Sequence, residues 1–335
     1  ENPDFAEYQF KFMDENNSYS TFAPYWCDDD TFKASGMYGR LQKDRTFDGF
    51  TPVSMLRSAW NDPNALYAAI KGGYPQISHA DMDTGTFTVA ALGEEWSSEL
   101  YPRIDSRVGF PNQSRMTRFI YYAASPQGHN TLLFNPGKMY PDMEYGQEYG
   151  VYTQFEKSYS DENTAFSILD MSETYRKYAE KVRRGIALIN NRREFLIQDE
   201  IQSSTSNLVY WFMHTDKEIE VNGNTAILKS GSKRLYCKIL SPSNAKFEVM
   251  QDTALPLTAG IFDYDEMMFG DGKKLAIKTE TTGNDKIAVW MVPLTEHDPI
   301  PYEEPAVKSL DEWPLTEQDA ARLDSVTING ESYKN

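Results

Sequence analysis

From about Thr46 onward, the chain consists of short apolar runs, several with period-2 alternation, separated by Gly, Pro, Asn and Asp. Runs of this kind are typical of antiparallel strands whose alternate side chains face one core. We therefore predict a mainly β protein built as a layered antiparallel β-sandwich. The predicted strands span residues 53–60, 87–92, 131–134, 166–171, 182–189, 195–201, 208–214, 226–229, 234–240 and 286–292. Asn190-Asn191 and residues 221–224 are predicted turns between strands.

One segment supports two different structures. Asp62-Pro63, the run at residues 65–71 and Gly72-Gly73 have the order of a capped helix that ends at glycine. The alternative is a turn at residues 61–64 that joins two antiparallel strands, 53–60 and 65–71. Helix propensity favours the first structure.

Composition excludes several classes of protein. The 40% hydrophobic content, with 21 Tyr and 18 Phe among 335 residues, indicates a packed fold rich in sheet. A net charge of −17 argues against nucleic acid as a partner, because that binding needs a basic surface. An anionic ligand would be held by local arginines rather than by the overall field. No apolar run is long enough to predict a membrane span.

The N-terminal stretch differs from the rest. Phe5, Tyr8, Phe12 and Met13 share one face of a predicted helix over residues 4–16. A single amphipathic helix needs a partner to bury that face, so we expect upstream helical sequence. The aromatic, partly acidic stretch that follows is interpreted as a linker. We divide the chain at residues 1–44 and 45–335.

The two cysteines, Cys27 and Cys237, have no metal-binding or redox spacing. Buried free thiols are favoured over a disulfide, because free cysteine is itself a residue of protein cores.

The first stretch with recognisable chemistry is HADMDTGTF at residues 79–87. If this stretch is a strand, His79, Asp81 and Asp83 all project to one face, and that face is too polar for a core. The run then becomes apolar at Phe87, as expected for a strand that leaves a site and enters the core. An exposed polar strand end beside a turn explains the spacing equally well.

The second stretch is GHNTL at residues 128–132, in which His129 precedes an apolar run. Taken alone, a turn histidine bonded to the backbone explains it better than a metal ligand does. His214 is interpreted as a core or strand-edge residue and His297 as a solvated loop residue. Arg183-Arg184 and Arg192-Arg193 are interpreted as strand-edge charges rather than as a patch for acidic sugars.

Taken together, seven blocks resemble the heparinase II/III-like domain of polysaccharide lyases, in the order that this family shows. They are RSAWNDP at 57–63, ALY at 65–67, KGG at 71–73, SHADMDTGTF at 78–87, ALGEEWSSE at 91–99, Arg118, and GHNTL at 128–132. The resemblance favours the strand over the helix at residues 65–71. It also implies that residues 1–44 are the helical remnant of an α/α toroid that precedes the β-sandwich.

The resemblance implies a lyase that cleaves uronate-containing acidic polysaccharide by β-elimination, between the toroid and the sandwich. His79 matches a catalytic-site residue of the family. Asp81, Glu99 and His129 match its metal ligands, which are commonly zinc. Two departures are visible, Asp for His at 81 and Glu for Asp at 99. Two carboxylates with one imidazole form a harder ligand set, so Mn²⁺, Mg²⁺ and Ca²⁺ also fit. A direct hydrogen bond between Asp81 and His129 is the alternative without an ion.

Elimination needs a neutralised uronate carboxylate, a base for the C5 proton and an acid for the leaving oxygen. His79 and Tyr101 are the catalytic candidates, although tyrosines in β proteins more often serve packing. Arg115 and Arg118 are candidates for pairing with substrate carboxylates, and surface ion pairs are their alternative role.

Two other functions remain open from the sequence. One is a non-catalytic carbohydrate-binding β-sandwich that has lost part of the site, and the other is a hydrolase using water activated at Asp81, Glu99 and His129. Among the substrates of similar proteins are heparan sulfate, alginate and chondroitin. The resemblance implies a periplasmic or secreted protein.

Overall fold

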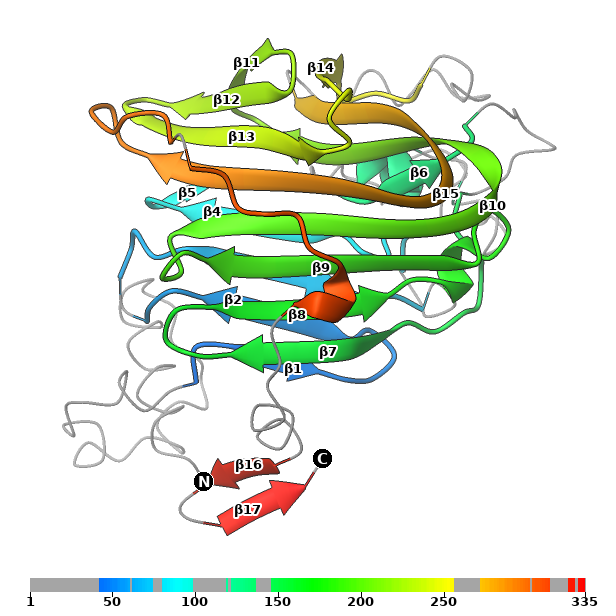
Figure 1. Cartoon of the computed structure of the whole chain (residues 1–335), viewed down its shortest axis with the longest axis horizontal. Coiled ribbons are helices and arrows are strands. Elements are labelled where there is room, and N and C mark those ends of the chain that lie inside the picture. Colours follow the sequence, from blue (N-terminus) through cyan, green and yellow to red (C-terminus); the bar gives the residue numbers. More distant parts are fainter. Residues whose placement is uncertain are drawn as a thin grey trace, which may run out of the picture.

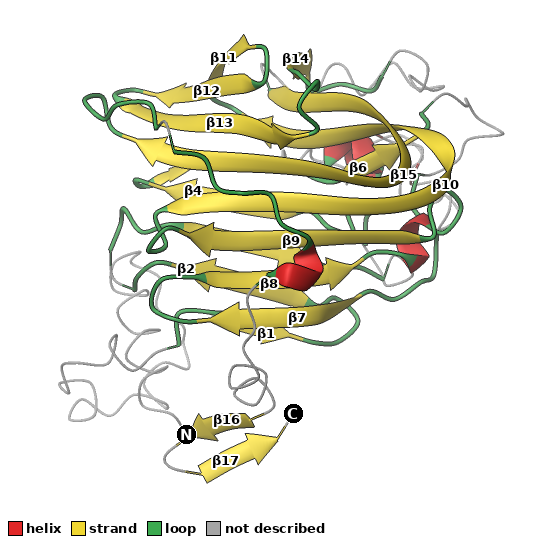
Figure 2. Cartoon of the chain, in the orientation of Figure 1, coloured by secondary structure: helices red, strands yellow, loops and turns green. Residues whose placement is uncertain are grey.

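The computed structural model describes residues 42–60, 62–74, 80–98, 119, 122–136, 146–255, 272–301, 303–313, 325–328 and 331–334. The predicted helix at residues 4–16, Cys27 and nearly all of the segment 1–44 lie outside these ranges. Within them the protein is mainly β and antiparallel, as predicted. Helices are confined to single 3-10 turns, shown in red in Figure 2.

A five-stranded antiparallel sheet forms one layer. Its strands are β1 (Arg45–Phe47), β2 (Val53–Arg57), β3 (Tyr67–Lys71), β4 (Phe87–Ala91) and β5 (Glu94–Glu95), paired in that order. Buried and half-buried residues alternate along β2, β3 and β4, so one face of this sheet is directed into the core. β3 pairs with both β2 and β4, which confirms the predicted strand in place of the helix.

A ten-stranded antiparallel sheet forms the second layer. Its main path runs β11-β12-β13-β15-β10-β9-β8-β7, with β14 paired to β15 and β6 paired to β10. The strands are β6 (Leu132–Phe134), β7 (Gln154–Ser160), β8 (Ala165–Asp170), β9 (Lys181–Ile189), β10 (Glu194–Thr215), β11 (Glu218–Asn222), β12 (Thr225–Ser230), β13 (Lys233–Ser241), β14 (Phe247–Gln251) and β15 (Lys273–Leu294). A separate pair joins β16 (Ser325–Ile328) to β17 (Glu331–Lys334).

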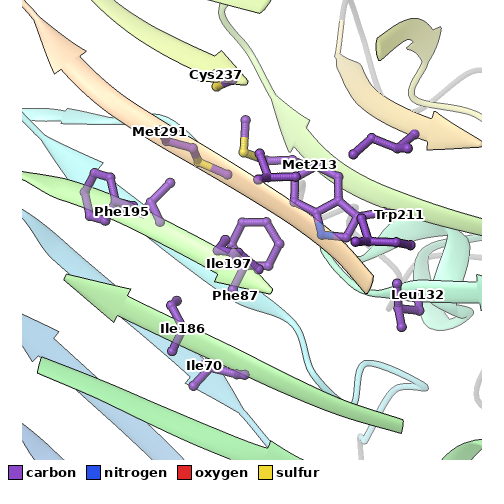
Figure 3. Close-up of a cluster of buried hydrophobic side chains, with 14 of the residues drawn as sticks. Ile70, Phe87, Leu132, Ile186, Phe195, Ile197, Trp211, Met213, Cys237 and Met291 are labelled. Atoms are coloured by element: carbon purple, nitrogen blue, oxygen red, sulfur yellow. The ribbon is translucent and has the colours of Figure 1, made fainter. Parts of the chain in front are cut away.

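The main core lies between the two sheets, with the small sheet behind the large one in Figure 1. Figure 3 shows side chains of both layers meeting there, Ile70 and Phe87 from the small sheet with Ile197 and Trp211 from the large one. The rings of Phe87 and Trp211 stack with their centroids 5.5 Å apart. Burial of these large apolar side chains is the main force that holds the sheets together.

The outer face of the large sheet has a second, smaller core. Residues 303–313, which include the single turn η7 (Leu310–Glu312), cross this face in front of the sheet in Figure 1. Leu310 and Trp313 are buried there against β8, β9 and β15 residues such as Phe166 and Trp290. The large sheet is therefore covered by apolar contacts on both faces.

Several strand predictions need correction at their ends. The predicted strands 195–201 and 208–214 are one continuous strand, β10, with an irregularity between Ser203 and Asn207. Residues 286–292 are only the second half of the 22-residue β15. The turn predictions hold, since Asn190 and Asn191 adopt positive φ between β9 and β10, and Gly223 does so between β11 and β12.

The interpretation as strand-edge charges is wrong for Arg183, Arg184 and Arg192. Arg183 and Arg184 lie on β9, which is paired on both sides, and both side chains are buried. Arg192 is buried too and bonds Asp44 and the backbone of Arg57. Arg183 bonds the carboxylates of Glu200 and Asp311, and Arg184 bonds that of Asp199, so these three arginines are structural.

One further prediction concerns a single residue. Cys237 is a free, buried thiol as predicted, and burial raises its pKa.

No helix in the described part of the chain has the length and apolar character needed to cross a bilayer.

Candidate functional site

The motif at residues 79–87 is a turn rather than a strand over its described part. Residues 80–86 are bend and turn, the amide of Thr86 donates to the carbonyl of Asp83 (2.9 Å), and Gly85 adopts φ +85°. The prediction that Asp81 and Asp83 share a strand face is therefore wrong. Asp81 is half-buried, whereas Asp83 is buried and accepts a hydrogen bond from Lys71 on β3.

The second motif lies directly against the first. The side chain of Asn130 donates to the carbonyl of Phe87 (2.9 Å), and the hydroxyl of Thr131 donates to the carbonyl of Thr84 (2.6 Å). Between η4 (Tyr122–Ala124) and the first motif, the amide of Met82 donates to the carbonyl of Ala124 (3.0 Å). Two loops more than forty residues apart in sequence therefore pack against each other as one unit.

A buried arginine joins these two loops to the large sheet. One nitrogen of Arg184, Nη1, donates to the carbonyl of Gly85 (2.7 Å) and to the carbonyl of Asn130 (2.8 Å). Its other two nitrogens bind both oxygens of Asp199 on the neighbouring strand, at 2.7 and 2.9 Å. Both side chains are fully buried, and burial raises the pKa of Asp199 despite the guanidinium beside it. Arg184 therefore fixes the relative position of the two motifs.

Behind the second motif lies a buried group of ionisable side chains, which we call the buried polar cluster: Tyr122, His214, Asp252 and Lys274. The hydroxyl of Tyr122 donates to Asp252, lies 3.1 Å from Nε2 of His214 and accepts from Nζ of Lys274 at 2.9 Å. All four side chains are almost completely buried. The cluster is therefore closed to a large substrate, and its role is to position the loop.

The hydrogen bonds of His214 define where its protons lie. Asn130 donates through Nδ2 to Phe87, so its Oδ1 accepts from the backbone amide of His214 (2.6 Å) and from Nδ1 of the ring (3.0 Å). The other ring nitrogen lies 3.1 Å from the carbonyl of Gln127 and 3.3 Å from Oδ1 of Asp252. Nδ1 therefore carries a proton, because the amide oxygen of Asn130 can only accept.

Burial dominates the titration of the cluster. It lowers the pKa of Lys274 to about 7, although the carboxylate of Asp252 favours the charged amine. Burial also raises the pKa of Asp252, against the hydrogen bond from Tyr122 and the charges of Lys274 and His129. His129 therefore lies within electrostatic reach of this cluster, and is itself buried.

Only part of the predicted site falls within the described residues. Asp81 and His129 are described and belong to the two joined loops. His79, Glu99, Tyr101, Arg115 and Arg118 lie outside the described residues, so their predicted roles stay predictions. The group Asp81, Glu99 and His129 stays a predicted metal site for the same reason.

The sequence reading missed the residues that hold the loops. His214 is buried as predicted, and His297 is exposed as predicted, but His214 belongs to a charged cluster rather than to an apolar core. Asp252 and Lys274 come from β14's end and β15, far along the chain. One sequence signal for the cluster was available. Lys274 begins the apolar run 274–277, and a lysine buried in such a run requires polar partners.

A glycine in the second motif gives a testable consequence of this packing. A Cβ at Gly128 would lie 2.7 Å from the carbonyl oxygen of Tyr122 and 3.1 Å from Cα of Ala123, both backbone atoms. We expect Gly128→Ala to lower the free energy of unfolding by about 1–3 kcal/mol through overpacking, measured by urea denaturation. Gly223→Ala is the comparison, because it has open space and only a positive φ. An equal or smaller loss at Gly128 would contradict the close packing.

Comparison with known proteins finds relatives by structure alone. A scan of protein-family models and a search of curated proteins both find no match. Among solved structures, heparan sulfate lyase HepC from Pedobacter heparinus is similar over 100% of this chain and 48% of its own, with a TM-score of 0.61 and 14% identity. A heparinase III structure is similar over 88% of this chain and 42% of its own, with a TM-score of 0.58 and 14% identity. Another heparinase III structure is similar over 72% of this chain and 35% of its own, with a TM-score of 0.53 and 12% identity. These likenesses show a shared β fold, and the chain spans about half the length of these structures or less.

Proposed function

We propose that this chain is the β-sandwich part of a polysaccharide lyase that cleaves uronate-containing acidic polysaccharide by β-elimination. The observation that carries the proposal is the bond set of Arg184. It joins Gly85 to Asn130, and so connects the two stretches that resemble the lyase family. The fold shared with heparan sulfate lyase supports it. Fold alone does not define activity, so the argument depends on the site.

The proposed reaction removes the C5 proton of a uronate and expels the oxygen at C4. His79 neutralises the substrate carboxylate or shares in proton transfer. Tyr101 accepts the proton from C5 or donates a proton to the oxygen that leaves C4. Arg115 and Arg118 pair with further carboxylates along the chain of sugars. The described residues supply the frame: Lys71 holds Asp83, and the bonds among residues 80–86 and 129–131 keep the loop beside His79 in place.

The proposal includes a divalent metal held by Asp81, Glu99 and His129. Zinc follows from the resemblance, and the carboxylate-rich ligand set also suits manganese, magnesium or calcium. A bound metal would supply positive charge between the two loops. Held by residues of separate segments, such an ion would join the loop of Asp81 to that of His129.

The whole protein is proposed to carry an N-terminal α/α toroid and to act in the periplasm or outside the cell. The solved lyases that the chain resembles are about twice its length, which leaves room for such a partner domain.

The lyase proposal is tested by ultraviolet absorbance of the unsaturated product, with heparan sulfate, chondroitin and alginate as substrates and the full-length protein as enzyme. His79→Ala is expected to reduce turnover by about 100-fold or more, because it removes a group that acts on the transferred proton or carboxylate. His297→Ala, at an exposed loop residue, is the matched control and should keep full turnover. Release of sugar without the absorbance change would indicate hydrolysis and overturn the proposal.

Metal removal is expected to loosen the two loops. After dialysis against a chelator, the protein should lose about one metal ion per chain and several degrees of melting temperature, because a ligand bound only to the folded state stabilises it. Elemental analysis and thermal denaturation measure both effects, and Asp81→Ala should reproduce them in untreated protein. A melting temperature that the chelator leaves unchanged but Asp81→Ala lowers would favour the direct Asp81–His129 hydrogen bond.

A further inference from the structure

Three aromatic side chains gather on the surface at one end of the small sheet. We call Phe50, Tyr74 and Tyr152 the aromatic platform. Phe50 is 61% exposed and Tyr152 is 54% exposed, which is unusual for large apolar residues. Tyr74 and Tyr152 stack with centroids 4.1 Å apart and planes 8° apart, and Phe50 lies 5.8 Å from both rings. The platform is thus an ordered surface rather than a set of scattered residues.

The backbone holds the platform in place. Its rings come from three chain segments that hydrogen-bond to one another beside each ring. The amide of Gly72 donates to the carbonyl of Pro52 (2.7 Å), and the amide of Gly73 donates to the hydroxyl of Thr153 (2.8 Å). A Cβ at Gly73 would lie 3.6 Å from Cα of Thr84, so the platform segment packs directly on the loop of the candidate site. The rings are therefore positioned before any ligand arrives, on a segment that contacts Thr84 of the candidate site.

A cavity of about 410 Å³ opens beside the platform. It is lined by Asp48, Gly49, Pro52, Tyr152, Thr153, Gln154, Asp170 and Glu173. Its volume is in the range of small-ligand sites. The described residues that line it include three carboxylates and a side-chain amide but no lysine or arginine. Glu173 also pairs with Arg176, and one oxygen of Asp170 accepts from Ser172. The other carboxylate oxygens and the amide of Gln154 can bond hydroxyl groups of a ligand.

The combination of stacked rings and acceptors matches a sugar. The electron-rich face of an aromatic ring attracts the weakly positive C–H bonds on one face of a pyranose, and carboxylates bind the hydroxyls at its edge. The acidic lining disfavours a uronate or a sulfated ring. We propose that the aromatic platform and its cavity form a subsite for an uncharged pyranose unit of a glycan chain. This inference rests on the proposed function, since it assigns the neutral sugar of a mixed polysaccharide to a position beside the cleavage site.

Gel retardation of the chain by uncharged soluble glycans tests the subsite without any turnover. Galactan, xylan and hydroxyethylcellulose serve as probes in native gels, and at least one of them should retard the wild-type chain. Phe50→Ala and Tyr152→Ala are each expected to lower the affinity measured by retardation by about 3- to 10-fold. Each substitution removes one ring that contacts the sugar. Tyr152→Phe should retain it, because the ring rather than the hydroxyl makes the contact. Ile300→Ala is the matched control, since Ile300 is also exposed, at 42%.

Each outcome separates this inference from the lyase proposal. If the platform variants bind all probes as the wild type does, or if no probe is retarded, the subsite is overturned even when the unsaturated product still forms. If they lose binding while the absorbance assay shows no product, the subsite stands and the lyase proposal fails. If the platform variants instead have a lower melting temperature but keep the gel retardation, other residues of the protein cover the platform. That result would also overturn the subsite.

Discussion

Replacing Arg184 by methionine is expected to lower the free energy of unfolding by about 3–5 kcal/mol, the loss typical of a broken buried ion pair. The substitution leaves the carboxylate of Asp199 buried without its partner, and it also removes the donor that the carbonyls of Gly85 and Asn130 share. Urea denaturation measures the loss. Turnover should fall together with stability, because the two loops lose their common anchor.

The double variant Arg184→Met with Asp199→Leu separates charge from packing. It removes both charges, so it should recover part of the lost stability relative to Arg184→Met alone. Arg193→Met is the control, because Arg193 is exposed in the turn before β10, and a change there is expected to stay within about 0.5 kcal/mol. A loss of less than about 1 kcal/mol for Arg184→Met would contradict the structural role given to this pair.

The stability supplied by Lys274 is expected to depend on pH. Its pKa in the folded state is about 7, against 10.5 for an ordinary lysine, mainly because burial disfavours the charge. Between these two values the unfolded chain binds a proton that the folded chain has released. The contribution of Lys274 to the free energy of unfolding therefore rises with pH, by up to about 1 kcal/mol per pH unit, from near pH 7 to near pH 10.

A comparison with Lys274→Met isolates this effect. The difference in unfolding free energy, wild type minus variant, should increase steadily between pH 7.5 and 9.5 in urea denaturation experiments. Both proteins keep His129, His214 and Asp252, so the difference reports mainly the lysine. Lys278→Met, an exposed lysine on the same strand, should show a flat difference. A flat difference for Lys274 as well would mean that the buried amine keeps its proton.

The fold was readable from the sequence because its signals are local. Alternation and turn residues predicted most of the strands, and Asn190-Asn191 and Gly223 predicted two turns, since each depends on a few neighbouring residues. The continuity of β10 was not readable in the same way. Ser203 to Asn207 is polar and resembles a loop, yet pairing with β15 resumes on both sides of it. Only the partner strand makes that stretch part of one ladder.

The candidate site was readable only where residues resemble a known motif. The two loops were found by their sequence, but the strand geometry predicted for Asp81 and Asp83 was wrong, because the positive φ of Gly85 turns the chain there. Arg184 was misread as an edge charge because neither its buried partner nor its carbonyl contacts are near it in sequence. The buried polar cluster combines four distant segments, and its members carry no shared pattern.

The long pairing of β10 with β15 has a consequence for the order of folding. β9 and β10 are joined by a short turn, whereas β15 meets β10 only after the chain has returned from a distant segment, with Thr215 paired to Lys273. Loop-closure entropy favours the local pairing first and delays the distant one. Lys274 lies next to the pair of Thr215 and Lys273, at the end of the ladder where the two strands are nearest in sequence, and the buried polar cluster needs this pairing to bring Lys274 beside His214. The support of the loop with His129 therefore depends on a pairing between distant segments, whereas the β9–β10 hairpin depends on a local one.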